Sequence, residues 1–306
     1  MLARAFGEEG HEVVILSRSS GSAPWRFVSW DAKNPGDWIR EIDGADVVIN
    51  LAGRNVNCRY TEANRRQIKE SRIQSTEAVG RAIAQSSKPP RVWLQASTAT
   101  IYAHRYDAPN EEETGLIGGS ESDVPDSWKF SIEVAKSWEA AAYAVETPNT
   151  RRVMLRSSIV LSPDKGGIFD VLLDMVRRGL GGTNADGRQY VSWIHGEDFI
   201  RALKWLIDHE LEGAVNVAAP NPLPNAEFMR TLRKAWGAKI GLPSTRWMLD
   251  LGAIVLKTET ELILKSRRVV PKRLLDSGFE FRFPTWNEAA TDLCLRWRYQ
   301  GVNVRE

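Results

Sequence analysis

Short apolar runs alternate with amphipathic stretches along most of the chain. The apolar runs contain many β-branched residues, which predicts buried parallel strands. They cover 12–17, 27–30, 46–52, 91–97, 151–160 and 214–219. The amphipathic stretches predict helices at 61–86, 126–145 and 196–209. Strands that alternate with helices indicate a parallel sheet covered on both faces, and right-handed crossovers make it a doubly wound α/β fold.

The first residues have the pattern of the second half of a βαβ unit. Leu2, Ala5 and Phe6 have helical spacing, and Gly10 is placed like a glycine that ends a helix in the left-handed conformation. In a dinucleotide-binding unit, a first strand and a glycine-rich turn precede such a helix and hold the pyrophosphate. No such turn lies between a strand and a helix in this sequence. We therefore expect the 306-residue chain to be an incomplete form of a longer gene product.

The pattern changes after about residue 220. The stretch "NPLPNAEFMRTLRKAWG" begins with turn residues and predicts a helix whose N-cap is Asn225, and the sequence up to 277 is mostly helical. We expect a dinucleotide-binding domain over 1–219 and a smaller, mainly helical lobe on the substrate side over 220–306. The loop at 105–125 is polar and acidic, and long loops of this kind often carry function.

Composition narrows the class of protein. Lys and Arg number 41 against 39 Asp and Glu, so nothing indicates a nucleic acid or a membrane surface as partner. Cys58 and Cys294 are the only cysteines and have no metal-ligand spacing, which favours a reducing, cytoplasmic location and no metal site. We expect a small molecule as substrate, and a homodimer is a candidate assembly.

The tip of the strand at 12–17 is a candidate cofactor contact. In doubly wound folds, a carboxylate at this place holds the 2′-hydroxyl of NAD, whereas an arginine accepts the 2′-phosphate of NADP. The strand ends in Ser17 and Arg18 without a nearby carboxylate, which favours NADP; the alternative is a solvated loop arginine. Asp31 follows the strand at 27–30 and is a candidate adenine contact.

Two further strand ends carry residues suited to binding a ligand. The strand at 46–52 ends in Asn50, Leu51, Ala52 and Gly53, where small residues let the backbone approach a ligand closely. The strand at 91–97 carries hydroxyl groups at or beyond its carboxyl edge, on Ser97, Thr98, Thr100 and Tyr102. Open α/β sheets bind ligands at that edge, and a hydroxyl there can bond a substrate carbonyl.

Several motifs occur in the order typical of an extended short-chain dehydrogenase/reductase. They are "NLAG", "STATIY", "RSSIVLS" and "SWIHGEDFIRAL". The stretches "FSIEVAKSWEAAA", "RRGLGGTNADGRQYVSWIH" and "VVPKRLLDSGFEFRFPT" resemble more closely the subgroup called the epimerase family, or atypical extended reductases, which has a characteristic C-terminal domain. The resemblance runs from residue 1 to about 293 and implies a Rossmann-like domain that binds NADP at its strand tips. It also implies cofactor contacts from Arg72, Arg156 and Ser157, and Thr98 as the catalytic hydroxyl.

The proton relay usual in that superfamily is missing. The relay is a Tyr-x-x-x-Lys pair on the helix after the hydroxyl-bearing strand, in which the lysine lowers the pKa of the tyrosine. Alignment on "SWEAAA" puts Ser131 and Ala135 at these positions, and a shift by one gives Ile132 and Lys136. The resemblance implies that the subgroup as a whole lacks the pair.

Other residues are candidates for proton transfer. We hypothesise that Tyr102, four residues past Thr98, replaces the lost tyrosine. His195 is an acid/base candidate; its alternative role is a hydrogen-bonded histidine that ties a strand to the helix at 196–209. The basic stretch at 54–72 is either an anion site or a solvated helix face.

Three functions remain open from the sequence. The first is an NADP-dependent oxidoreductase or epimerase that acts on a small polar, sugar-like molecule. The second is a non-catalytic NADP-binding or regulatory protein, which the missing Tyr/Lys pair motivates. The third is a degenerate fragment that binds no cofactor.

Overall fold

Most of the apolar runs of the sequence lie in two main parallel sheets. The computed structural model describes residues 1–306 apart from 20, 22, 122–123, 245–260 and 303–306. One sheet pairs β1 (Val14–Ser17) with β2 (Arg26–Ser29). The other has the order β3 (Val47–Asn50), β4 (Val92–Thr98), β5 (Arg151–Ser157) and β9 (Gly213–Val217). Leu16 and Val28 pack on the same buried cluster as Val48, so the two sheets share a core.

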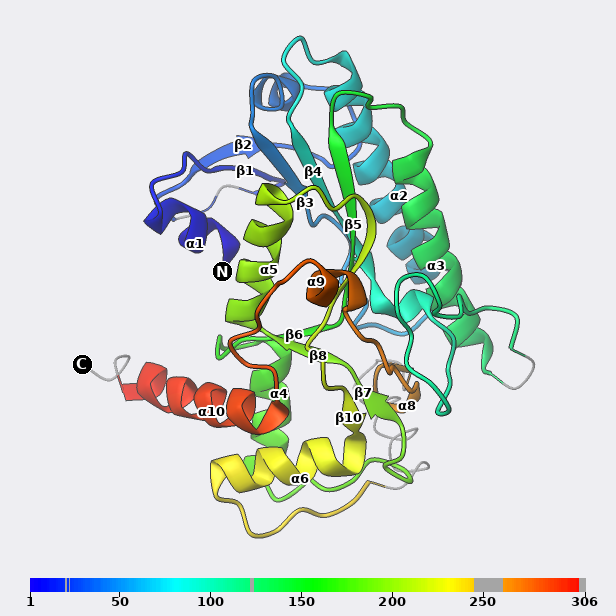
Figure 1. Cartoon of the computed structure of the whole chain (residues 1–306), viewed down its shortest axis with the longest axis vertical. Coiled ribbons are helices and arrows are strands. Elements are labelled where there is room, and N and C mark those ends of the chain that lie inside the picture. Colours follow the sequence, from blue (N-terminus) through cyan, green and yellow to red (C-terminus); the bar gives the residue numbers. More distant parts are fainter. Residues whose placement is uncertain (20, 22, 122–123, 245–260, 303–306) are drawn as a thin grey trace.

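Helices cover both faces of the four-stranded sheet. On one face lie α2 (Glu62–Gln85) and α3 (Asp126–Tyr143), packed against each other, and on the other lies α5 (Gly196–Asp208) (Figure 1). Helix α1 (Leu2–Glu8) packs Leu2 and Phe6 against the α5 side, and Gly10 after it has φ +86° as predicted. The predicted doubly wound arrangement is therefore confirmed.

Alternating side chains of the strands fill the two cores. Trp93 and Met154 lie in the cluster beneath α2 and α3, whereas Leu94, Val153 and Leu155 lie in the cluster beneath α5. Successive residues of a strand point to opposite faces, so a sheet covered twice needs apolar residues at nearly every position. This requirement explains the continuous apolar runs in the sequence.

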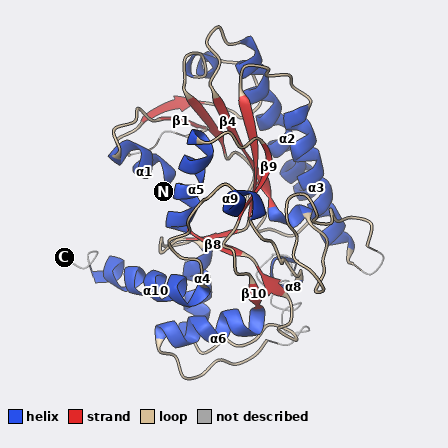
Figure 2. Ribbon diagram, in the orientation of Figure 1, coloured by secondary structure: helices blue, strands red, loops and turns tan. Residues whose placement is uncertain are grey.

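The predicted strand at 151–160 is divided in two. β5 ends at Ser157, and β6 (Ile159–Leu161) leaves the main sheet to pair with β8 (Trp193–His195). A second short pair joins β7 (Tyr190–Val191) to β10 (Leu223–Pro224) in antiparallel register. The chain thus leaves the main sheet after its carboxyl edge and builds a second layer there (Figure 2).

The second layer has its own apolar core. Its helices are α4 (Ile168–Arg177), α6 (Asn225–Trp236) and α10 (Trp286–Val302). α8 (Glu261–Leu264) lies in the C-terminal segment, and α9 (Lys272–Asp276) packs on β9, with Leu274 in the cluster beneath α5. Two 3₁₀ turns, η1 (Asp37–Glu41) and η2 (Ala99–Ile101), belong to the first layer. The core joins Phe169 and Trp193 to Phe228 and Trp286, so it draws on residues from both sides of position 219. The domain boundary at 219 stays a prediction.

The predicted N-cap of α6 is wrong. Pro224 holds the N-cap position, and Asn225 is the first helical residue. Its side-chain carbonyl accepts a hydrogen bond from the backbone of Asn184 (2.9 Å) instead of from its own helix. An asparagine suits both roles chemically, and the tertiary partner decides between them.

The loop at 105–125 is fastened to the C-terminal segment. Asn110 is fully buried, its backbone N–H donates to the carbonyl of Arg268 (2.6 Å), and its carbonyl accepts from Val270 (3.0 Å). The carboxylate of Glu112 accepts from the backbone of Asn216 (2.9 Å) and of Arg273 (3.3 Å). These bonds place residues 265–273 over the carboxyl edge of the main sheet.

Candidate functional site

The strand ends predicted to bind a cofactor lie together at one edge. Thr98 and Ser157 end β4 and β5 and are opposite each other in the parallel register. On the adjacent strand, Asn50 donates to Gln95 (2.9 Å) and accepts from the backbone of Ala52 (3.0 Å). The second bond turns the chain away from the sheet, so Leu51 and Gly53 are exposed beyond the edge.

Arg72 holds the loop that follows this turn. Its Nη1 donates to the carbonyls of Arg54 (3.1 Å) and Ile68 (3.0 Å), and its guanidinium lies over the ring of Trp138. Burial lowers the pKa of Arg72. A Cβ at Gly53 would stand 3.3 Å from Arg72 Cγ, so a larger residue there would require the arginine side chain or the loop to shift by a few tenths of an ångström.

The tip of β1 carries an arginine without a protein partner. Arg18 is exposed, and within the described part of the chain no hydrogen bond or ion pair involves its guanidinium group. Ser17 Oγ accepts from the backbone of Ser19 (3.3 Å). Asp31 uses its carboxylate in a local turn, where it accepts from the backbone N–H groups of Lys33 and Asn34, and these bonds lower its pKa.

Three predicted residues meet in a buried network below the edge. Glu139 accepts two hydrogen bonds from Arg156 (2.8 Å each) and one from Ser97 (2.6 Å). The phenol of Tyr102 accepts from Arg156 (3.0 Å) and donates to Asn216 (2.8 Å). Burial raises the pKa of Tyr102. Both hydrogen-bonding capacities of this phenol are therefore used inside the protein, and its role as proton donor stays a prediction.

His195 caps a helix. It is the N-cap residue of α5, where Nδ1 accepts from the backbone of Glu197 (3.1 Å) and Nε2 lies 3.1 Å from a carboxylate oxygen of Asp292. Burial lowers the pKa of this histidine. The geometry matches the alternative role derived above, a histidine that ties β8 to the helix after it.

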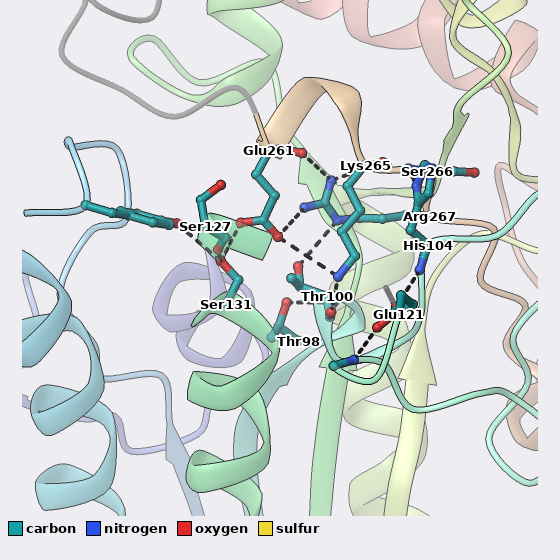
Figure 3. Close-up of polar contacts among 12 residues, drawn as sticks. Thr98, Thr100, His104, Glu121, Ser127, Ser131, Glu261, Lys265, Ser266 and Arg267 are labelled. Carbon is teal, nitrogen blue, oxygen red and sulfur yellow. Dashed lines mark hydrogen bonds and ion pairs between the residues drawn. The ribbon is translucent and has the colours of Figure 1, made fainter. Parts of the chain in front are cut away.

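A cluster that sequence analysis did not find covers Thr98 (Figure 3). Ser131, one of the two α3 positions that alignment offers for the usual tyrosine, hydrogen-bonds to Glu261 and lies 3.5 Å from the hydroxyl of Tyr60. The carboxylate of Glu261 is 3.6 Å from Arg267 Nη2 and 4.0 Å from Lys265 Nζ. Helix α3 and the C-terminal segment thus meet through a charged group of side chains.

One residue of η2 connects this cluster to the hydroxyl of Thr98. The carbonyl of Thr100 accepts from Lys265 Nζ (2.8 Å), and its backbone N–H donates to Thr98 Oγ1 (3.2 Å). Its own hydroxyl accepts from Arg267 Nε (3.4 Å). Figure 3 shows Glu261, Lys265 and Arg267 directed toward Thr100 and Ser131.

The electrostatics of Lys265 are unusual. Its side chain is 1 % exposed, as is that of Glu261. Burial and the neighbouring Arg267 lower the pKa of Lys265 to about 7, against the opposing effect of Glu261 and Glu121. A lysine of this kind holds or gives up its proton near neutral pH.

The remaining features of the described residues concern metal ligands, membrane spans and cysteines. No group of three or more His, Cys, Asp or Glu side chains is gathered there in a way that could hold a metal ion. Among the same residues, no helix combines the length and apolar character needed to cross a membrane. Cys58 is half-buried and Cys294 buried, and both are free thiols.

Two family patterns match successive parts of the chain. The pattern of the NAD dependent epimerase/dehydratase family matches residues 1–218. The chain belongs to this family. A domain of unknown function (DUF1731) matches residues 245–293 and contains Glu261, Lys265 and Arg267. The resemblance deduced from the motifs is therefore confirmed, including its characteristic C-terminal domain.

Individual relatives cover nearly the whole chain. Epimerase family protein SDR39U1 from Bos taurus is 32 % identical over 303 residues, which cover 95 % of this chain and 94 % of the relative. Epimerase family protein YfhF from Bacillus subtilis is 30 % identical over 291 residues, with 93 % and 90 % covered.

Solved structures show the same fold. The crystal structure of human epimerase family protein SDR39U1 (isoform 2) with NADPH is similar, with a TM-score of 0.82 and 27 % identity over 96 % of this chain and 94 % of that one. The UDP-glucose 4-epimerase of Thermotoga maritima, at 12 % identity and a TM-score of 0.73, covers 98 % of this chain and 95 % of its own. At that identity the similarity shows the Rossmann-like fold alone.

Proposed function

We propose that this chain is an NADP-dependent oxidoreductase or epimerase of the extended short-chain reductase type, acting on a small polar, sugar-like molecule. The free hydroxyl of Thr98 carries the proposal. Thr98 Oγ1 accepts a hydrogen bond from Thr100, while in the described residues its own hydrogen has no acceptor. A hydroxyl in this state at the carboxyl edge of a parallel sheet is suited to donate to a substrate oxygen.

The residues at the strand tips fit NADP at its 2′-phosphate and at its nicotinamide. Arg18 is exposed and has no partner among the described residues, and it would pair with the 2′-phosphate, since guanidinium groups bind phosphate through two parallel hydrogen bonds. The turn from Asn50 to Gly53 would let the backbone approach the cofactor, and Thr98 would lie at the nicotinamide end. NADPH, when bound, supplies a hydride at C4 of its nicotinamide. The similarity to a relative crystallised with NADPH supports this assignment.

The cofactor and the chemistry are tested separately. Titration with NADPH, followed by its fluorescence, measures binding. Arg18→Met should weaken NADPH by about tenfold or more through loss of one charge-assisted contact, and should leave NADH unaffected. Equal affinity of the wild type for NADH and NADPH would contradict the assignment to NADP.

The proposed reaction is tested by measuring NADPH oxidation with aldehydes, ketones and sugars as substrates. Thr98→Val should lower NADPH oxidation by about 10²-fold, as removal of one oxyanion donor does. Thr291→Val, which changes an exposed threonine of α10, is the matched control. If Thr98→Val reduces every carbonyl as fast as the wild type, the proposed site is wrong.

A second candidate function is NADP binding without turnover. The observation that favours it is Ser131 and Ala135 in place of the tyrosine and lysine, because a hydride acceptor also needs a proton. Tight NADPH binding, with no oxidation in the presence of any carbonyl tested, would support this candidate over the first.

A further inference from the structure

The residues that cover Thr98 come from the C-terminal segment, and the fold fixes their position. Arg267 N–H donates to the carbonyl of Tyr190 (2.8 Å), and Ser266 N–H donates to His104 Nδ1 (2.8 Å). The buried Asn110 bonds the next residues from the other side. Ser266 and Arg267, which follow Lys265, are therefore anchored, and they hold Lys265 against the carboxyl edge of β4.

The amine of Lys265 has unused hydrogen-bonding capacity in a buried place. An ammonium group has three donors. One donates to the carbonyl of Thr100 (2.8 Å), and the carboxylate of Glu261 is too far for a hydrogen bond at 4.0 Å. In the part of the chain that the structure describes, the other two donors have no acceptor. A buried polar group without partners carries a cost, which a bound ligand atom would remove.

The amine and the free hydroxyl flank the same residue. Lys265 Nζ bonds the carbonyl of Thr100 and Thr98 Oγ1 bonds its N–H. The proposed function gives the Thr98 hydroxyl to the substrate oxygen, and the backbone of Thr100 links that hydroxyl to the amine of Lys265. The usual tyrosine and lysine on α3 are absent here, where Ser131 and Ala135 stand.

Other proton donors at this edge are committed elsewhere. The phenol of Tyr102 has a donor and an acceptor partner in the buried network, and His195 caps α5 and faces Asp292. Lys136 of α3 is exposed and makes no bond among the described residues, whereas Lys265 is buried and donates to the backbone of Thr100 (2.8 Å).

We propose that Lys265 Nζ is the proton donor and acceptor of the reaction at Thr98, supplied by the C-terminal segment in place of the tyrosine and lysine of α3. The proposal rests on the proposed function. In the reducing direction, the substrate carbonyl carbon gains the hydride and the π electrons of the C=O bond move to oxygen. That oxygen takes a proton from Lys265 Nζ, which leaves the alcohol, NADP⁺ and a neutral amine that water reprotonates. In the oxidising direction, the neutral amine accepts the proton of the alcohol.

The charges around the amine suit this exchange. On its own segment, Arg267 repels the ammonium form and Glu261 stabilises it. From the loop at 105–125, Glu121 stabilises it as well, and His104 faces Lys265 from the end of η2 with its own pKa lowered by burial and by that lysine. Together with burial, these groups hold the pKa of Lys265 at about 7, so both forms are populated at neutral pH.

The first experiment follows Lys265 directly. The protein with ¹³Cε-labelled lysine is titrated by NMR with and without NADPH, and the Lys265 resonance is identified by its loss in Lys265→Met, or in Lys265→Arg should the methionine variant not fold. We expect its pKa near 7, separate from the bulk lysines near 10.4. A pKa above about 9 would overturn the proposal, because such an amine stays charged throughout the neutral range.

The second experiment measures turnover with NADPH and 9,10-phenanthrenequinone. The rate of the wild type should decline above neutral pH, and Lys265→Met should lose about 10²–10⁴-fold in rate and lose that decline. Lys272→Met, which removes an exposed lysine of α9, should behave as the wild type. A Lys265→Met rate within about threefold of the wild type would overturn the proposal.

NADPH binding separates the two proposals. Lys265→Met should bind NADPH within about threefold of the wild type, since the amine contacts the substrate and not the cofactor phosphates. A wild type that binds NADPH but has an ordinary Lys265 pKa retains the proposed function and loses the proton-transfer role. A wild type that binds no NADPH overturns the proposed function itself, whatever the pKa.

Discussion

The pKa of Lys265 has a consequence for stability that needs neither cofactor nor substrate. Folding lowers this pKa from 10.5 to about 7, because burial and Arg267 disfavour the charged form. Between these two pH values the unfolded chain binds a proton that the folded chain has released. The free energy of unfolding therefore rises with pH in this window, whereas below pH 7 both states are protonated and this contribution is constant. Lys265→Met removes the group and keeps a side chain of similar length.

The magnitude follows from the two pKa values. One pKa unit corresponds to about 1.4 kcal/mol, so the stabilisation by this group amounts to about 2–3 kcal/mol by pH 9 and about 5 kcal/mol at pH 10.5. The wild type should gain this much over Lys265→Met as the pH rises. Tyrosines and other lysines titrate in the same range, but they are common to both proteins and cancel in the difference.

Denaturant unfolding measures the effect. Tryptophan fluorescence is followed at several pH values from 6 to 10, and the free energies of wild type, Lys265→Met and Lys272→Met are compared. Lys272 is exposed and paired with Asp276, which raises its pKa, so this control should show no gain for the wild type above pH 7. A difference between wild type and Lys265→Met that is constant within about 1 kcal/mol over the whole range would refute the assigned pKa.

Three further predictions concern other buried or local bonds. Arg156→Met leaves the carboxylate of Glu139 buried without its cation, and should cost about 3–5 kcal/mol in denaturant unfolding; restoration by a second change, Glu139→Leu, checks the cause. Asp198→Ala removes the acceptor of the backbone N–H groups of Arg282 and Phe283 (2.8 Å each), and should cost about 2–4 kcal/mol by the same assay. The pKa of Asp43 is lowered to about 2 by hydrogen bonds from Ser86 and Lys88, so its stabilisation is present above pH 4 and is lost as the pH falls toward 2. The melting temperature of Asp43→Asn should therefore fall less steeply between pH 4 and pH 2 than the melting temperature of the wild type.

The fold could be predicted because burial on two faces leaves a direct signal in the sequence. Trp93, Leu94 and their neighbours are apolar in succession because each face of β4 meets a different core. The same principle does not reveal where a strand changes partners. The continuous apolar run at 151–160 contains the break at Ser158, where the chain leaves β5 for a pairing with β8 that depends on residues 193–195.

The candidate site could be predicted only where chemistry coincides with a strand end. Thr98 was found in this way, since a hydroxyl at the carboxyl edge is informative without knowledge of its neighbours. Tyr102 lies at the same edge in sequence, yet η2 turns the chain so that its phenol meets Asn216 and Arg156 below the sheet. Side-chain direction after a turn is set by packing, and the sequence pattern carries no record of it.

Glu261, Lys265 and Arg267 could not be found from the sequence. In "ELILKSRR" a glutamate precedes a lysine by four residues, which is typical of a solvated helix face. Their burial depends on contacts across long stretches of chain, such as the bonds of Asn110 to the backbone of Arg268 and Val270. A run of charged residues in the sequence is therefore weak evidence that these residues are exposed, because the fold can bury the run against another layer.

Each of the two layers supplies one of the two groups that the proposed reaction uses. The Rossmann-like layer holds the Thr98 hydroxyl, but its α3 carries Ser131 where a tyrosine would give a proton. The C-terminal segment has the buried amine of Lys265, but that amine has no catalytic neighbour except at the edge of β4. The proposed chemistry combines the Thr98 hydroxyl of one layer with the Lys265 amine of the other, so it exists only where they are docked.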